Sequence, residues 1–322
     1  MRVGAILAGG LLALVSVGGA FGFGTISGLG QNREHERITR HALGCDGGPA
    51  SACFEPKTLN ELAGESGTWG AVGAPDNPFR GLMLSSPAHC DNGDWLAVQG
   101  YPHAQAEARA NLVACRAGMK SRLDEAVRDA GALLDSTGHV DDAQIPTLVG
   151  CTFNGRQGRA KCNVLEDFGL LLHASQDFYS HSNWVDQAAV GPHTLENPEG
   201  LGADGPAPWL DLRQDAPAFP PGLITGCFDT ISLASPAKGC SGHVKHEDLN
   251  KDKGQIDPTI GAGTTNRGKV NDNFAHAVQA AIADTRDKWA TLRERLVATY
   301  GAARGSRMIC AITHDDPART CG

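Results

Sequence analysis

His173, Asp177 and His181 are the residues of this chain whose types and spacing best suit chemistry, because they recur at every fourth position. On an α-helix they would share one face, along about 12 Å of its axis. Apolar and aromatic neighbours at 170–172, 178 and 179 indicate that this face is buried, where imidazoles and a carboxylate are costly without a compensating partner. The pattern therefore predicts two metal ions about 3.5–4 Å apart, bridged by Asp177, with His173 on one and His181 on the other. The alternative is a solvated helix face on which the spacing arose by chance.

A metal cluster needs more ligands than one helix supplies, and both halves of the chain contain candidates. Those before the helix are His35, Asp76 and His89, and those after it are His243, His246, Glu247, Asp252 and His276. Because His89 precedes Cys90, a disulfide at that cysteine would hold the backbone of the histidine in place. The segment 248–252 has the spacing of a calcium loop, but its glycine comes one position late and no closing glutamate follows, so calcium is weakly supported.

Other catalytic patterns are missing or incomplete. The chain has no GxSxG nucleophile motif. The segment 263–269 resembles a phosphate-binding loop, yet Val270 stands where a Ser or Thr would hold magnesium. The net charge of −8 argues against nucleic acid as a partner, because phosphate binding requires a basic face.

The beginning of the chain and its cysteines both indicate export. Residues 1–20 have the features of a signal peptide: Arg2, an apolar run over 6–17, and small residues up to Ala20. That run is too short to span a membrane, so we expect a processed chain without a transmembrane anchor, secreted or periplasmic. The ten cysteines agree with an oxidising compartment. Local pairing predicts five bridges: Cys45–Cys53, Cys90–Cys115, Cys151–Cys162, Cys227–Cys240 and Cys310–Cys321.

The secondary-structure pattern is helical. Helices are expected over 31–44, 55–65, 105–134, from near Cys162 to Ser182–Asn183, and over 271–300. The Gly- and Pro-rich segments 67–101 and 187–265 are expected to be long loops, and no alternating strand pattern of useful length occurs. These features predict an all-α fold in which disulfides hold long loops, with 21–322 as a single domain.

Three blocks of the sequence resemble the Het-C proteins. They are 21–26 followed by 30–33 and His35, the block 172–184 with its HxxxD pair, and the downstream segment from His246 to Asp252 with His276. Het-C proteins are similar to zinc-dependent phospholipases C and fungal zinc-dependent single-strand nucleases, which are all-α and carry three zinc ions. Two departures stand out: the phospholipases place the next histidine six residues after the helical aspartate, and their later HxxxE pair has a counterpart here only far downstream, in His243 and Glu247.

The resemblance implies a role for each candidate. Asp177 would bridge two zinc ions, with His89 and His173 completing one and His181 the other, while His35 would hold a third. Asp76 would serve as ligand and general base for a hydroxide held by the metals. Cleavage after Ala20 would make the amine and carbonyl of Phe21 ligands as well. Ligands of the remaining metal region would come from His243, His246, Glu247, Asp252 and His276.

These inferences predict a secreted zinc-dependent phosphodiesterase with two to three zinc ions, as in two-metal and larger sites. The expected activity is that of a phospholipase C, which hydrolyses phospholipid headgroups at a membrane surface. A single-strand nuclease with the same metals ranks lower, because base stacking needs aromatic side chains and these are only 6% of the chain. The non-enzymatic alternative is a toxin-like interaction protein with structural zinc.

Overall fold

The computed structural model describes residues 23–28, 31–45, 53–145, 150–228, 239–254 and 262–321. The predicted signal peptide, 1–20, and the predicted ligand Phe21 lie outside these residues. Within them the structure is mainly helical, which confirms the helical class expected from the sequence. No helix among the described residues is long and apolar enough to cross a membrane.

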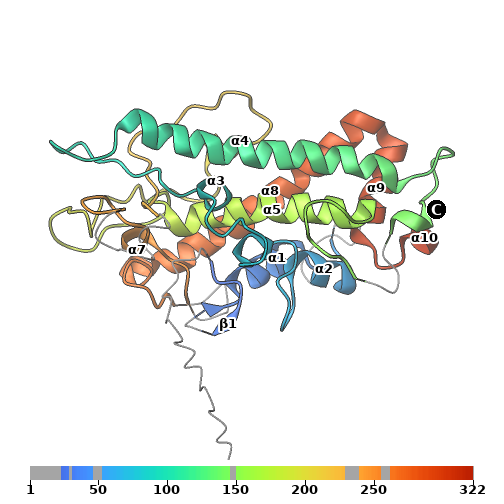
Figure 1. The fold of residues 1–322 in the computed structure, drawn as a ribbon, viewed down its shortest axis with the longest axis horizontal. Helices are drawn as coiled ribbons and strands as arrows, with labels where there is room; N and C mark the ends of the chain where they lie inside the picture. Colours follow the sequence, from blue (N-terminus) through green and yellow to red (C-terminus); the bar gives the residue numbers. More distant parts are fainter. Residues whose placement is uncertain are drawn as a thin grey trace, which may run out of the picture.

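Three long helices run the length of the molecule (Figure 1). They are α4 (Gln105–Ala130), α5 (Ala160–His181) and α8 (Asn273–Tyr300), and α5 packs against both of the others. Every residue of α5 except Asn163 is buried, which agrees with its nearly continuous apolar sequence. A helix surrounded in this way places its few polar side chains in the interior of the protein.

Shorter elements cover the ends and one side of these helices. The helices are α1 (Glu34–Leu43), α2 (Pro56–Ala63), α3 (Ser86–His89), α7 (His246–Leu249), α9 (Ala302–Thr313) and α10 (Pro317–Thr320). Single 3₁₀ turns are η2 (Ala74–Asp76), η3 (Gly131–Leu133), η4 (Asp142–Gln144), η5 (Pro208–Leu210) and η6 (Val270–Asp272). The strands β1 (Ser27–Gly28) and β2 (Gln31–Asn32) form one short antiparallel pair.

The helix expected over 31–44 begins later than predicted. Arg33 adopts the left-handed conformation (φ 57°), which a helix cannot continue through, and residues 31–32 pair with β1 instead. The sequence analysis also missed α9 and α10. Gly301, with φ 81°, separates α9 from α8 and directs the chain back along the bundle.

All five predicted cysteine pairs are disulfides in the structure. Cys90–Cys115 links the end of α3 to α4, and the long loops after α2 and α5 each contain or adjoin a bridge. The bridges therefore restrain segments that have little regular structure of their own.

Gly169 shows how closely α5 is enclosed. A Cβ at this position would lie 2.5 Å from the carbonyl carbon of Ala71 and 2.8 Å from the nitrogen of Val72. Gly118 in α4 is also helical, but a Cβ there would meet no atom within 4 Å. The two glycines thus offer a matched pair of substitutions.

We expect Gly169→Ala to destabilise the protein by about 1–3 kcal/mol, because backbone must move to admit the methyl group. Gly118→Ala should stabilise it by up to about 1 kcal/mol, since alanine favours the helix and nothing obstructs it. Urea unfolding of both variants measures the difference. Equal stabilities for the two would contradict the close packing of α5 against 71–72.

Candidate metal centre

The candidate ligands converge on the buried face of α5 from five separate segments. His173, Asp177 and His181 come from α5 itself, as the four-residue spacing predicted. His35 comes from α1, Asp76 from η2 and His89 from α3, while His246 begins α7 and Asp252 follows it. All eight side chains are buried. The tertiary fold thus gathers most of the predicted ligands around one helix.

Asp177 lies at the centre of the first group. Its Oδ1 is 3.1 Å from His35 Nε2 and accepts a hydrogen bond from the backbone nitrogen of Phe23 at 3.2 Å. Its Oδ2 is 2.9 Å from His89 Nδ1 and 3.0 Å from His173 Nε2. The two oxygens therefore face different histidines, which is the arrangement that a carboxylate bridging two metal ions requires.

Asp76 completes the side of this group that faces His89 and His173. Its Oδ1 lies 3.9 Å from His89 Nδ1 and 3.7 Å from His173 Nε2, and it has no hydrogen-bond partner. Its Oδ2 accepts a hydrogen bond from the hydroxyl of Thr25. Thr25 thus fixes the carboxylate so that one oxygen points at the two imidazoles.

His181 belongs to a second group, beside the first. Its Nδ1 is 3.2 Å from Asp91 Oδ1, and its Nε2 is 3.3 Å from Asp252 Oδ1. His246 faces the same two carboxylates, at 3.0 Å from Asp91 and 3.6 Å from Asp252. Ser180 donates a hydrogen bond to Asp252 Oδ1 at 2.7 Å. The direct partners of His181 are therefore Asp91 and Asp252, whereas the sequence analysis had paired it with Asp177.

Hydrogen bonds behind the first group orient its imidazoles. His173 Nδ1 donates to the carbonyl of Val72 at 2.9 Å, which leaves Nε2 free to face the cluster. His35 Nδ1 donates to Gln176 Oε1 at 2.7 Å, and the Gln176 amide is held in turn because it donates to Thr39 and Thr285. Partners of this kind fix the ring and tautomer of metal-binding histidines.

Several ligand-type atoms in these groups are buried without a hydrogen-bond partner. They are His35 Nε2, Asp76 Oδ1, His89 Nε2, His181 Nε2, His246 Nε2 and Asp252 Oδ2. Buried polar atoms are rarely left unsatisfied in proteins, because each one loses its hydration at a cost of about 1–3 kcal/mol. Imidazole nitrogens and carboxylate oxygens are the donor set that zinc accepts. The residues present thus fit a metal centre.

Electrostatics in the metal-free chain tie the carboxylates to the histidines. Burial would raise the pKa of Asp177, but the charges of His173, His35 and His181 hold that pKa well below its usual range. Burial would likewise lower the pKa of His89, yet the hydrogen bond and charge of Asp177, with Asp76 and Asp91, raise it to about 9. In the metal-free chain a proton on His89 therefore helps to balance the carboxylates, whereas burial lowers the pKa of His173.

The remaining sequence candidates lie elsewhere. Glu247 is exposed and pairs with Lys245 at 3.3 Å, because the residue after His246 in α7 points outward. His276 is exposed on α8. His243 is half-buried and contacts Asp94 at 2.7 Å. The structure brings none of these three to the two groups around α5.

Sequence reasoning missed Asp91 as a ligand, although it lies only two residues after His89. It also gave no role to His103 or Asp94. None of the three belongs to a periodic pattern, and their contacts depend on loop packing. Proximity to Cys90 was the one local signal that marked this segment.

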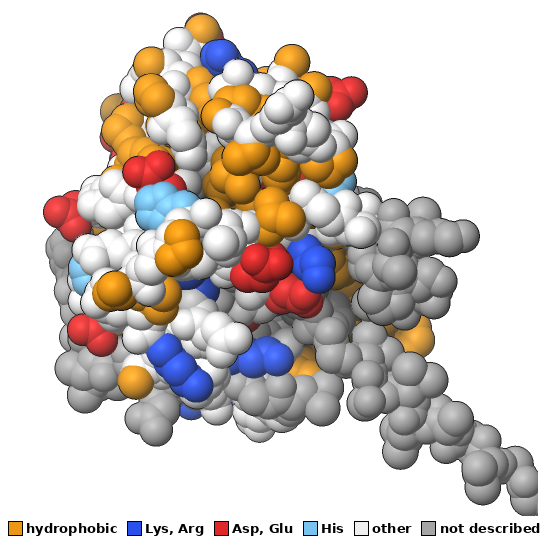
Figure 2. Space-filling model, turned by 90° about the vertical axis from the view of Figure 1, so that its left-hand side faces the viewer, with side chains coloured by type: hydrophobic (Ala, Val, Ile, Leu, Met, Phe, Trp, Pro, Cys, Tyr) orange, Lys and Arg blue, Asp and Glu red, His pale blue; other side chains and the backbone are white. Residues whose placement is uncertain are grey.

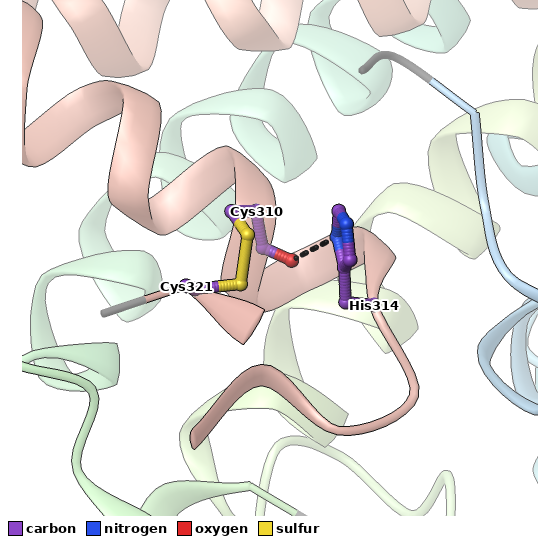
Figure 3. A group of neighbouring side chains, drawn as sticks. All are labelled: Cys310, His314 and Cys321. Atoms are coloured by element: carbon purple, nitrogen blue, oxygen red, sulfur yellow. Dashed lines mark hydrogen bonds between the residues drawn. A yellow bond between two sulfur atoms is a disulfide. The ribbon is translucent and has the colours of Figure 1, made fainter. Parts of the chain in front are cut away.

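A further group of ligand types lies at the C-terminal end, where His314 adjoins Cys310 and Cys321 (Figure 3). The two sulfur atoms are joined in a disulfide, and His314 Nδ1 donates to the carbonyl of Cys310 at 3.0 Å. Because the thiolate is the metal-binding form of cysteine, the oxidised pair offers no such ligand.

Comparison with known proteins finds no matching family model, no matching curated protein and no matching solved structure.

Removal of a ligand should reduce metal content in a position-specific way. We expect Asp177→Asn and His181→Ala each to lose at least one zinc ion per chain, because each residue contacts several other ligands in its group. His276→Ala serves as the matched control and should keep the full content. Elemental analysis of the purified proteins measures this. Equal zinc content in His181→Ala and the wild type would show that the second group does not bind metal.

The histidine pKa shifts predict how stability depends on pH. A histidine whose pKa is raised in the folded state contributes stability that is complete below about pH 6.5 and is lost as pH rises through the folded value, here about 9 for His89. The metal-free protein should therefore lose about 2 kcal/mol between pH 6.5 and 8 from His89 alone.

Urea unfolding in chelator at these two pH values tests this, with His89→Gln as the comparison that lacks the loss. The zinc-loaded protein should not follow the same trend, because zinc binds the neutral imidazole and competes with protons. An equal decline in His89→Gln and wild type would show that His89 is not the source.

Proposed function

We propose that this chain is an exported zinc-dependent phosphodiester hydrolase of the phospholipase C type, with the helical architecture of that class. The observation that carries the proposal is that the two carboxylate oxygens of Asp177 face different histidines: Oδ1 faces His35, while Oδ2 faces His89 and His173. A second group around His181 lies next to it on α5. Phosphodiester hydrolysis commonly uses neighbouring metal ions held in this way.

The first group would hold two zinc ions and the second group a third. His35 and Asp177 would hold one zinc ion; Asp76, His89, His173 and Asp177 a second; and Asp91, His181, His246 and Asp252 a third. When bound, zinc supplies Lewis-acid polarisation of phosphoryl oxygens and a reactive water at neutral pH. The chain supplies a nearly dry setting, in which electrostatic interactions are strengthened.

Asp76 is the residue we assign to proton transfer. Thr25 occupies its Oδ2, and its Oδ1 remains without a hydrogen-bond partner beside His89 and His173. An oriented carboxylate oxygen that is free on the ligand side is suited to accept a proton from water.

Exposed apolar side chains favour a lipid substrate. Phe79 is 95% exposed, and Leu84 and Val98 are also exposed; all three lie in 77–98, the segment that carries His89 and Asp91. Aromatic and aliphatic side chains at such positions can enter the boundary of a lipid surface.

The test compares hydrolysis of phosphatidylcholine vesicles with cleavage of single-stranded DNA by the zinc-loaded protein. We expect diacylglycerol release that a chelator abolishes and that Asp76→Asn lowers by about 100-fold or more, since a general base contributes at least that factor. Preference for DNA over every phospholipid would favour the nuclease. Full zinc content without hydrolysis of either substrate would favour a structural centre.

The same assay separates chemistry from surface binding. Phe79→Ser should lower the rate on vesicles by about tenfold, the equivalent of one lost buried apolar side chain, and leave the rate on a soluble short-chain phospholipid unchanged. Val113→Ser, at an apolar position on α4 that is 51% exposed, should affect neither substrate. Equal effects of both variants on vesicles would argue against a specific lipid-facing role for 77–98.

A further inference from the structure

Asp94, His103 and His243 form a third group, separate from the two around α5. His243 Nδ1 is 2.7 Å from Asp94 Oδ2, and His103 Nδ1 is 3.2 Å from Asp94 Oδ1. One ligand-type atom from each of the three residues lies within 4.8 Å of the others. The Asp94 side chain is 1% exposed, whereas those of His103 and His243 are 15% and 16% exposed. The group therefore lies at the boundary between the interior and solvent.

This group repeats a contact of the inner centre. The segments 91–94 and 243–246 meet through Asp91 with His246 at 3.0 Å and, three residues further along, through Asp94 with His243 at 2.7 Å. His181 and Asp252 add to the inner contact, and His103 adds to the outer one. The same two segments thus present two histidine–carboxylate sets, one buried and one accessible.

The outer set is held in position before any ligand arrives. Tyr101 donates a hydrogen bond from its hydroxyl to Asp94 Oδ2 at 2.6 Å and accepts one from the backbone nitrogen of Val244 at 2.8 Å. His103 Nδ1 also lies 2.9 Å from the carbonyl of Asp94. The Cys227–Cys240 disulfide restrains the chain just before His243. Preorganisation of this kind lowers the cost of binding an ion.

We propose that Asp94, His103 and His243 bind a further zinc ion, distinct from the metals of the inner centre. Two imidazoles and one carboxylate are a common zinc ligand set, and three protein ligands leave a coordination position for water or an external ligand. Tyr101 orients Asp94 and is not itself a ligand. The ion fastens 94–103 to 243, and so joins the two segments that also deliver Asp91 and His246 to the interior.

The position of this set makes it reachable. Figure 2 views the end of the molecule at which α4 begins and α7 lies in Figure 1. Histidine side chains are visible on this surface. The inner ligands are at most a few per cent exposed. Zinc at the outer set should therefore exchange with solvent more readily than zinc at the inner centre.

The experiment is calorimetric titration of the zinc-loaded full chain with zinc, after a mild chelator has removed loosely held ions. We expect one further binding event per chain in the wild type, weakened at least tenfold in His103→Ala and in His243→Ala. His193→Ala, an exposed histidine outside the group, is the matched control and should titrate like the wild type. Elemental analysis beforehand should show the same inner zinc content in all four proteins.

Identical affinity and number of sites in the wild type and both variants would overturn the proposal. Thermal unfolding in chelator shows whether the variants fold, and His103→Ala is expected to do so because its side chain is partly exposed. The result is independent of the proposed hydrolase activity. If the protein proves inactive but His103→Ala still weakens the additional zinc-binding event, the outer zinc site is supported and the hydrolase proposal is not.

Discussion

The whole structure depends on the neutralisation of one buried carboxylate. Asp177 lies on α5 and is fully buried, and an ionised carboxylate there would oppose folding without a balancing positive charge. Three imidazoles and the backbone nitrogen of Phe23 approach its two oxygens. These partners come from 23–35, from His89 and from α5 itself. The centre can therefore form only when these segments fold against α5. Protons on the imidazoles or bound metal ions can supply the balancing charge.

The rest of the fold brings those partners to α5 and keeps them there. Helices α4 and α8 enclose α5 and exclude water from its polar stripe. Gly169 allows 71–72 to approach so closely that the carbonyl of Val72 reaches His173. Cys90–Cys115 ties the segment that carries His89 and Asp91 to α4. Long loops can thus position ligands accurately, because each is restrained by a helix contact or a disulfide near the ligand itself.

The histidine–carboxylate sets differ in how deeply they are buried. The sets around Asp177 and His181 are buried, where electrostatic interactions are stronger than in water. The set around Asp94 lies where its histidines are partly exposed. The segments 91–94 and 243–246 contribute residues both to this set and to the inner set around His181. An ion bound at the outer set would therefore affect how firmly Asp91 and His246 are held.

The sequence by itself determined what depends on local spacing. The burial and position of α5, the shared face of His173, Asp177 and His181, the helical class and the five cysteine pairs all follow from periodicity or from neighbours along the chain. Only the tertiary structure decided how the ligands group: His181 with Asp91 and Asp252, Asp177 with His35, and His243 with Asp94. These pairings join residues far apart in the sequence through loops without periodicity. The orientation of Glu247 and His276 toward solvent was likewise set by packing, which residue types and spacing do not encode.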